Sequence, residues 1–324
     1  MHYKIAVITP SDANDILGDT IIDGLADLIS EKKDLEVRIP AETKYVVPKE
    51  LKNSVVSTKE FIEFAQTADL IFLIWGKRKL NTEIAEKINR WDKTIFIDGA
   101  EVGKDRRYDP AMQNIIIHGT FGGYGRIYDD MHKKCAMYFK REKPYRAGVK
   151  PLPFGIERKY QVYDSSTKKD IDFFCVFGQE EFPALRKHVR EIVQNFCQKN
   201  NFTCHTEKTK TKEEFYKLSA RSKVGISVGG GGYDTARFWE TLGNNALLIT
   251  EKIDIFEPDS SILDYERVFE FNNLYDLEYY LEKVGHILKN FYNQDNLQLE
   301  YEKILANHSS KARVEYIFHE FFKN

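Results

Sequence analysis

The stretch Ser222–Thr250, SKVGISVGGGGYDTARFWETLGNNALLIT, decides how the rest of the chain is interpreted. A β-branched apolar run, Val224–Val228, leads into four consecutive glycines, Gly229–Gly232. A short helical stretch follows them, and a second apolar run, Ala246–Ile249, comes after it. Short apolar runs are typical of buried strands, and the glycines between them indicate a turn. We therefore predict a strand, a glycine turn, a helix and a strand.

The glycine turn and the helix after it have the features of a phosphate site. Glycines let a ligand approach the backbone closely, and the free N–H groups at a helix N-terminus favour an anion. Asp234 or Thr235 can cap this helix. Arg237 and Glu240 share one helix face, where a guanidinium can pair with a diphosphate and a carboxylate can accept hydrogen bonds from ribose. The alternative is a plain glycine loop followed by a solvated surface ion pair.

The composition of the whole chain is that of an ordinary globular protein. Its 324 residues suggest about two domains, and its hydrophobic and charged fractions are 42% and 30%. The net charge of −2 gives no overall attraction to nucleic acid or membranes. Its four cysteines lack C-x-x-C spacing, and MHYKIAVITP lacks the apolar core of a signal peptide. No run is long enough to span a membrane, so we expect a cytoplasmic protein.

Strand patterns and helix patterns alternate in both halves of the chain. The strands expected in the first half are Lys4–Thr9, Leu35–Ile39, Leu70–Trp75, Thr94–Ile97 and Asn114–His118. Those expected in the second half are Ile171–Phe177, Phe202–His205, Val224–Val228, Ala246–Ile249 and Arg267–Phe271. Buried strands that alternate with helices predict an α/β fold with parallel sheets covered on both faces. Ligands of such sheets bind beyond the carboxyl ends of the strands.

A change of character near the middle of the chain predicts a domain boundary. Met131–Lys150 is rich in lysine and arginine and is followed by the punctuation PLPFG at Pro151–Gly155. We expect one domain at 1–150, a second at 151–300 and a terminal helical segment at 301–324. The basic residues fit a solvated helix face, and an anionic acceptor is the alternative.

Four segments of the chain resemble a known family. They are YFKREKPY…VKPLPFGIE at Tyr138–Glu157, the strand end Phe177–Gly178, RFWETLG at Arg237–Gly243 and HSSKAR at His308–Arg313. Together they resemble GT-B glycosyltransferases, in particular the spore-maturation type grouped as "glycosyl transferases group 1". The resemblance implies two Rossmann-like domains facing across a cleft, with the C-terminal helix packing back on the N-terminal domain. The acceptor would bind the N-terminal domain and the nucleotide sugar the C-terminal one.

The resemblance also implies a set of donor-binding residues. Glu240 would hold the ribose hydroxyls, Arg237 the diphosphate, and Arg186 would be a second basic residue. The full set is Arg186, Gly229, Gly230, Gly231, Gly232, Tyr233, Asp234, Arg237 and Glu240. Many retaining members have a glutamate at the position that Gly232 occupies here, so the stereochemical outcome stays open.

An inverting reaction would need a general base from the first half of the chain. Asp98, at the end of the strand Thr94–Ile97, is the first candidate, and His118 and Asp12 are weaker ones. Each also has an ordinary structural interpretation, as a turn, cap or core residue. The histidines have no chelating spacing, so we predict no metal site and no cofactor besides the donor. Arg237, Arg186 and the helix dipole would neutralise the leaving diphosphate.

These observations predict a hexosyltransferase-type enzyme that uses a UDP- or GDP-linked sugar. The expected acceptor is a surface glycan or another polyanionic molecule; modified DNA is an alternative that the sequence does not favour. Two other functions stay open. One is a nucleotide-sugar epimerase or hydrolase on the same architecture, and the other is a nucleotide-binding protein without catalysis.

Overall fold

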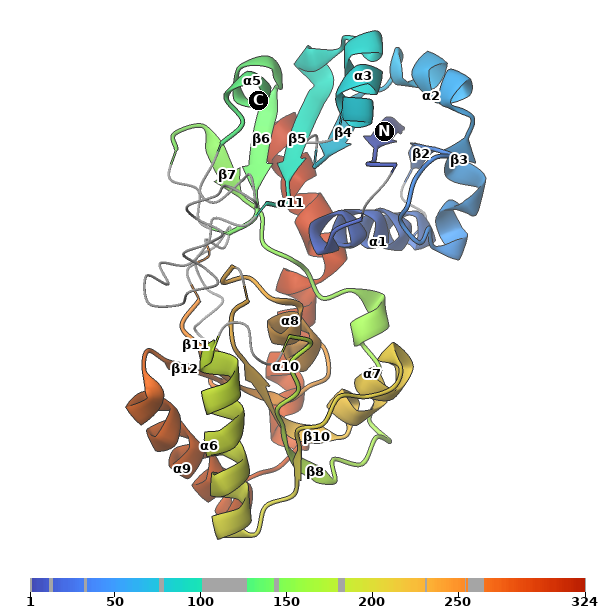
Figure 1. Cartoon of the computed structure of the whole chain (residues 1–324). Coiled ribbons are helices and arrows are strands. Elements are labelled where there is room, and N and C mark those ends of the chain that lie inside the picture. The colour runs from blue at the N-terminus through green and yellow to red at the C-terminus, as the bar shows by residue number, and fades with distance from the viewer. Residues whose placement is uncertain are drawn as a thin grey trace. The chain divides into compact units, whose positions relative to one another are not determined.

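The chain forms two compact units with parallel sheets (Figure 1). A computed structural model describes residues 2–11, 14–31, 34–75, 79–100, 127–142, 146–179, 184–230, 232–253, 255 and 265–323. Within the described residues, the chain passes from the first unit to the second between Gly155 and Ile156, and it returns to the first unit after His308. The predicted α/β class is therefore confirmed, as is the packing of the C-terminal helix on the first unit.

The first unit is built on a parallel sheet of order β3-β2-β1-β4-β5-β6-β7 among the described residues. The strands are β1 (Tyr3–Ile8), β2 (Leu35–Pro40), β3 (Val55–Val56), β4 (Leu70–Ile74), β5 (Thr94–Asp98), β6 (Met137–Lys140) and β7 (Val149–Pro151). Every residue of β4 and β5 is buried, because helices cover both faces of a doubly wound sheet. The predicted strand Asn114–His118 lies outside the described residues.

Side-chain caps begin some of the helices of the first unit. They are α1 (Ile16–Ser30), α2 (Thr58–Ala65), α3 (Lys79–Ile88), α5 (Asp129–Lys134) and α11 (Ser310–Phe322), with 3-10 turns at η1 (Lys49–Ser54) and η2 (Trp91–Lys93). The Asp15 carboxylate accepts the Gly18 N–H at 2.9 Å at the start of α1. Ser57 and Glu60 form a capping box at the start of α2.

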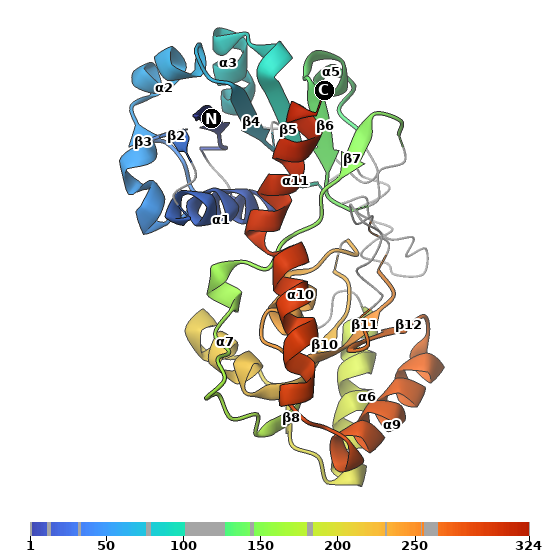
Figure 2. The ribbon, with the colours of Figure 1, turned by 180° about the vertical axis from the view of Figure 1, so that it is seen from behind.

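The helix α11 lies beside α1, although they are separated by most of the chain (Figure 2). Gly24 permits the contact, because a Cβ atom there would lie 2.3 Å from the carbonyl oxygen of Ser310. Phe318 of α11 also stacks on Phe72 of β4, with ring centroids 6.3 Å apart. The last helix thus completes the core of the first unit.

The second unit has a parallel sheet of order β12-β11-β10-β8-β9 among the described residues. Its strands are β8 (Ile171–Phe174), β9 (Cys204–His205), β10 (Ser222–Ser227), β11 (Leu247–Glu251) and β12 (Val268–Phe271). Its helices are α6 (Ala184–Asn200), α7 (Lys212–Ala220), α8 (Ala236–Leu242), α9 (Leu274–Asn290) and α10 (Gln298–His308), with turns η3 (Arg158–Tyr160) and η4 (Asp295–Leu297). The main core lies between this sheet and the apolar faces of α6 and α9.

For the basic segment Met131–Lys150, the prediction of a solvated helix face is wrong at Lys140. The helix α5 ends at Lys134, and Lys140 belongs to β6, where its side chain is only 1% exposed. Asp98 lies opposite Lys140 in the parallel register of β5 and β6 and supplies the counter-charge. A charged residue can be buried when it is paired in this way.

None of the described helices combines the length and the apolar character that crossing a bilayer requires.

Candidate functional site

The strand order of the second sheet points to one ligand-binding position. If the strands β8 to β12 are numbered 1 to 5, their order in the sheet is 2-1-3-4-5, as in a doubly wound fold. The winding direction of such a sheet changes between strands 1 and 3, which are β8 and β10. Ligands of such sheets bind beyond the carboxyl ends of the strands at this switch point. Phe177 and Gly178 follow β8 there, and the glycine turn follows β10.

Arg186 joins the two loops at the switch point. Its Nη1 donates to the carbonyl oxygen of Gln179 at 3.1 Å, in the loop after β8. Its Nη2 donates to the carbonyl oxygen of Val228 at 3.1 Å, directly before the glycines. A Cβ atom on Gly230 would lie 3.2 Å from the same Nη2. The guanidinium is therefore at the glycine turn, where a side chain at position 230 would press against it.

The glycine turn also contacts a carboxylate that the sequence analysis missed. The N–H of Gly229 donates to Oε2 of Glu251 at 3.0 Å. Glu251 ends β11, and the register of β10 with β11 pairs Ser227 with Thr250, which places Glu251 beside the turn. The alignment of these two predicted strands could have suggested this neighbour. Gly231 lies outside the described residues.

The helix α8 does not begin directly at the glycines. It begins at Ala236, and Tyr233, Asp234 and Thr235 connect it to the turn. Thr235 is the N-cap residue, but its side chain makes no capping hydrogen bond and instead lies 3.1 Å from the Ser227 hydroxyl. The helix thus begins after one of the two residues predicted to cap it, but without the predicted side-chain hydrogen bond.

The Asp234 side chain is buried and hydrogen-bonded within the second unit. Its carboxylate is buried and accepts the indole N–H of Trp239 at 2.7 Å. The Trp239 ring in turn contacts His308, with centroids 5.8 Å apart. The hydrogen bond between Asp234 and Trp239 ties the segment before α8 to a buried side chain of the helix itself. Tyr233, next to it, is half-buried.

Arg237 and Glu240 form an ion pair that is largely buried rather than solvated. Nη1 of Arg237 lies 2.6 Å from Oε2 of Glu240, and the two side chains are 14% and 10% exposed. Nε of Arg237 donates to the carbonyl oxygen of Val176 at 2.9 Å, and the guanidinium lies 4.0 Å from the centre of the Phe215 ring. The pair ties α8 to the segment that follows β8.

Two tyrosines near Glu240 were also missed from the sequence. Burial, and next the negative charge of Glu240, raise the pKa of Tyr216 to about 12. Burial also raises the pKa of Tyr160, and the nearby Glu157 and Glu240 add to that effect. The Tyr160 hydroxyl donates to Glu157 Oε1 at 2.8 Å. No sequence pattern connects these tyrosines with α8, because they come from η3 and α7.

Asp98, the first candidate for the general base, is fully buried in the first unit. Its Oδ2 accepts hydrogen bonds from Tyr138 at 2.5 Å and from Nζ of Lys140 at 3.1 Å, and its Oδ1 accepts the Ala100 N–H at 2.8 Å. These contacts give the carboxylate a structural role. The other two candidates, His118 and Asp12, lie outside the described residues.

The described residues contain no group of three or more His, Cys, Asp or Glu side chains that could hold a metal ion. Asp170 and Asp172 have Asp-x-Asp spacing, but they pair separately with Arg221 and Lys223, each at 2.7 Å. This spacing is thus explained by two ion pairs.

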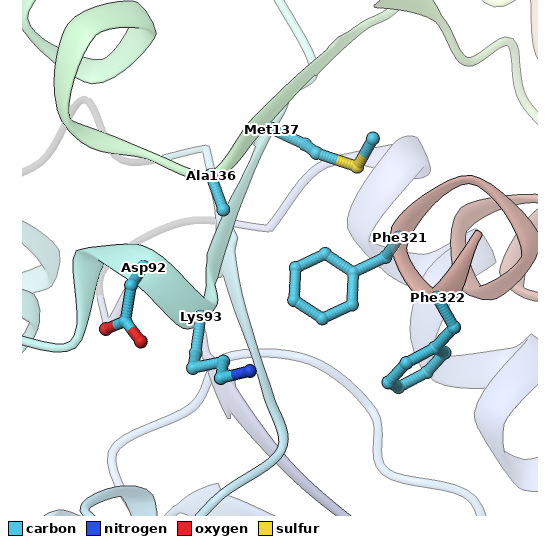
Figure 3. Close-up of a pocket in the computed structure, with 6 residues that line it drawn as sticks. All are labelled: Asp92, Lys93, Ala136, Met137, Phe321 and Phe322. Atoms are coloured by element: carbon cyan, nitrogen blue, oxygen red, sulfur yellow. The ribbon is translucent and has the colours of Figure 1, made fainter. Parts of the chain in front are cut away.

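The first unit contains a pocket of about 400 Å³ (Figure 3). It is lined by Asp92, Lys93, Ala136, Met137, Phe321 and Phe322. Lys93 directly precedes β5, and Met137 begins β6, so the pocket is at the amino ends of these strands. Since substrates of such sheets bind at the carboxyl ends, we do not assign this pocket to the candidate site.

Comparisons with known proteins establish the fold. No protein-family model and no curated protein sequence matches the chain. An α-glucosyltransferase in complex with UDP has 7% identity and a TM-score of 0.60, over 99% of this chain and 100% of that one. The chain has the GT-B glycosyltransferase fold.

Two further solved structures with the GT-B fold are similar over the same extent. An α-glucosyltransferase with UDP and a 13-mer DNA containing an HMU base has 8% identity and a TM-score of 0.59, over 99% of this chain and 100% of that one. A glycosyltransferase from Rickettsia africae ESF-5 has 11% identity and a TM-score of 0.56, over 100% of this chain and 99% of that one. The resemblance to the spore-maturation type stays a prediction.

Proposed function

We propose that this chain transfers a sugar from a nucleoside-diphosphate donor to a hydroxyl group of an acceptor. The observation that carries the proposal is the guanidinium of Arg186 beside Gly230, at the switch point of the second sheet. A permanent positive charge next to backbone without side chains suits a diphosphate. Solved structures of the same fold hold UDP, which makes UDP-sugars the first donors to test.

The geometry of the second unit supports each proposed donor contact. Arg186 and the N–H groups of the glycine turn other than that of Gly229, which donates to Glu251, would bind the diphosphate. In the pair on α8, Arg237 holds Oε2 of Glu240, and Oε1 would accept a hydrogen bond from a ribose hydroxyl. With Arg186 to stabilise the leaving group, we propose a reaction that needs no metal ion.

The proposed acceptor is a glycan or another polyanionic molecule. Modified DNA is included, because one structure of the same fold contains DNA with an HMU base. Binding to DNA would weaken steeply with salt as counterions are released, whereas binding to a neutral glycan would not. A salt series therefore separates a polyanionic acceptor from a neutral glycan.

The first experiment measures the melting temperature of the chain with UDP, GDP, ADP and CMP. A nucleotide that binds only the folded state raises this temperature, and Arg186→Met should reduce the shift. Release of UDP from UDP-sugars is then measured with hydroxymethylated DNA, with glycan extracts and without acceptor. Release that needs no acceptor would indicate a hydrolase, and nucleotide binding without any release would indicate a non-catalytic protein. Absence of any nucleotide-dependent shift would contradict the proposal.

A further inference from the structure

A groove on the second unit is lined by two helices, one of which also carries Arg186 near its start, outside the groove. The helices α6 and α9 lie side by side over the sheet (Figures 1 and 2). The groove between them has a volume of about 590 Å³, which is in the range of small-molecule sites. Each helix contributes side chains at positions i, i+3, i+4 and i+7, which form one continuous face. These residues are Ile192, Asn195, Phe196 and Lys199 of α6 and Tyr275, Glu278, Tyr279 and Glu282 of α9.

Two aromatic rings on α9 are exposed at this groove. Tyr275 is 84% exposed and Tyr279 is 62% exposed, although both are large side chains that could cover apolar surface. Asn273 caps the start of α9 by accepting the N–H groups of Tyr275 and Asp276, so the backbone that carries the rings is well anchored. Side chains four apart on a helix are about 5–6 Å apart, which suits contact with neighbouring units of one chain-like ligand.

The polar groups of the groove are uncommitted. Among the described residues, the side chains of Asn195, Lys199, Glu278 and Glu282 make no hydrogen bond or ion pair, and the hydroxyls of the two tyrosines make none either. The set includes donors and acceptors, and charges of both signs. Apolar floor is supplied by Phe196 and Leu281.

This combination selects one class of ligand. An apolar protein surface would bury four polar side chains without partners, which is costly. A polyanion would meet two carboxylates and one ammonium group. A neutral sugar chain satisfies every group, because its hydroxyls both donate and accept and its C–H faces pack on the electron-rich faces of aromatic rings.

We propose that the groove between α6 and α9 is a binding site for a neutral oligosaccharide, with pyranose rings stacked on Tyr275 and Tyr279. Asn195, Lys199, Glu278 and Glu282 bond the hydroxyls. The site is separate from the donor-binding residues and does not rest on the proposed function, because it requires binding and no transfer. On a glycan-modifying enzyme it would hold a polymeric substrate close to the protein between reactions.

The test uses the full chain and three neutral oligosaccharides, namely maltoheptaose, cellohexaose and chitohexaose. Calorimetry should detect binding of at least one of them. The double variant Tyr275→Ala/Tyr279→Ala should weaken that binding roughly tenfold, and Tyr275→Phe/Tyr279→Phe should largely retain it, since stacking needs the ring and not the hydroxyl. Phe291→Ala is the matched control, because Phe291 is an aromatic residue of the same unit that is 69% exposed and does not line the groove.

Three results would overturn the proposal. The first is that none of the oligosaccharides binds, and the second is that binding is equal in the double alanine variant, which would place it elsewhere. The third is a dimer in sedimentation experiments that the double variant dissociates, which would assign the groove to a second copy of the chain. Nucleotide binding by the same variants reports independently on the donor site, so failure here is distinguishable from failure of the proposed function.

Discussion

Replacing Asp98 by Asn tests whether this residue is structural or catalytic. The substitution keeps the shape of the side chain and removes its charge. Lys140, which is 1% exposed, would then retain only the carbonyl oxygen of Ala100 at 2.9 Å as a strong acceptor. Leaving a buried charge without its partner destabilises a protein by about 3–5 kcal/mol. That is a large fraction of a typical total stability of about 5–15 kcal/mol.

The assay is urea unfolding followed by circular dichroism, with a double-mutant cycle as the control. Lys140→Met in the Asp98→Asn background removes the orphaned ammonium group and should recover most of the lost stability. The coupling free energy between the two positions should then be at least about 1 kcal/mol. Tyr138 should stay protonated in all variants at neutral pH, because burial, and next the charge of Asp98, raise its pKa in the native protein.

The opposite result would refute the structural reasoning. If Asp98→Asn were as stable as the native protein and yet lost about 100-fold or more of its transfer activity, Asp98 would be the general base after all. The ion pair with Lys140 would then position the base rather than hold β5 and β6 together.

The remaining predictions concern the donor site, a buried lysine, the helix α11 and metal dependence. Arg186→Met should weaken UDP binding roughly 10–100-fold in calorimetry, since charged hydrogen bonds are lost, while Lys187→Met on the exposed side of α6 should not. Burial lowers the pKa of Lys169 to about 7, so the folded state releases this proton before the unfolded state does. Relative to Lys169→Met, the native chain should therefore gain stability as pH rises from about 7 towards 10, by up to about 1.4 kcal/mol per unit, in urea titrations. Gly24→Ala should lower the unfolding free energy by about 1–3 kcal/mol and expose α11 to proteolysis, whereas Gly178→Ala, which meets no atom within 4 Å, should not. Transfer activity should survive EDTA; loss on chelation that manganese reverses would contradict metal independence.

Most strands were predictable from the sequence because of how such sheets are buried, although β3, β6 and β7 were not predicted. Runs such as LIFLI at β4 have no polar face, since helices cover both sides of the strand. The order of the strands was not predictable from these runs, because any of them could pair with any other. The length of β9 was overestimated, since only Cys204 and His205 of the predicted Phe202–His205 form the strand.

The candidate site was predictable only where neighbours in space are close in sequence. Arg237 and Glu240 are one helical turn apart, and their pairing follows from helix geometry. The contact of Glu251 with Gly229 needs the register of two strands, and the pair of Lys140 with Asp98 needs the order of the first sheet. A lysine that will be buried looks the same in a sequence as one that will be solvated.

The return of α11 to the first unit has a consequence for synthesis on the ribosome. Residues 156–308 are made and can fold before the helix that completes the earlier unit exists. Until then, the surface of α1 that receives Ser310 and Val314 around Gly24 stays open to solvent and to other chains. The part of the protein that is translated first is therefore the part that matures last. A fragment of residues 1–155 should need α11 as an added peptide to complete its core.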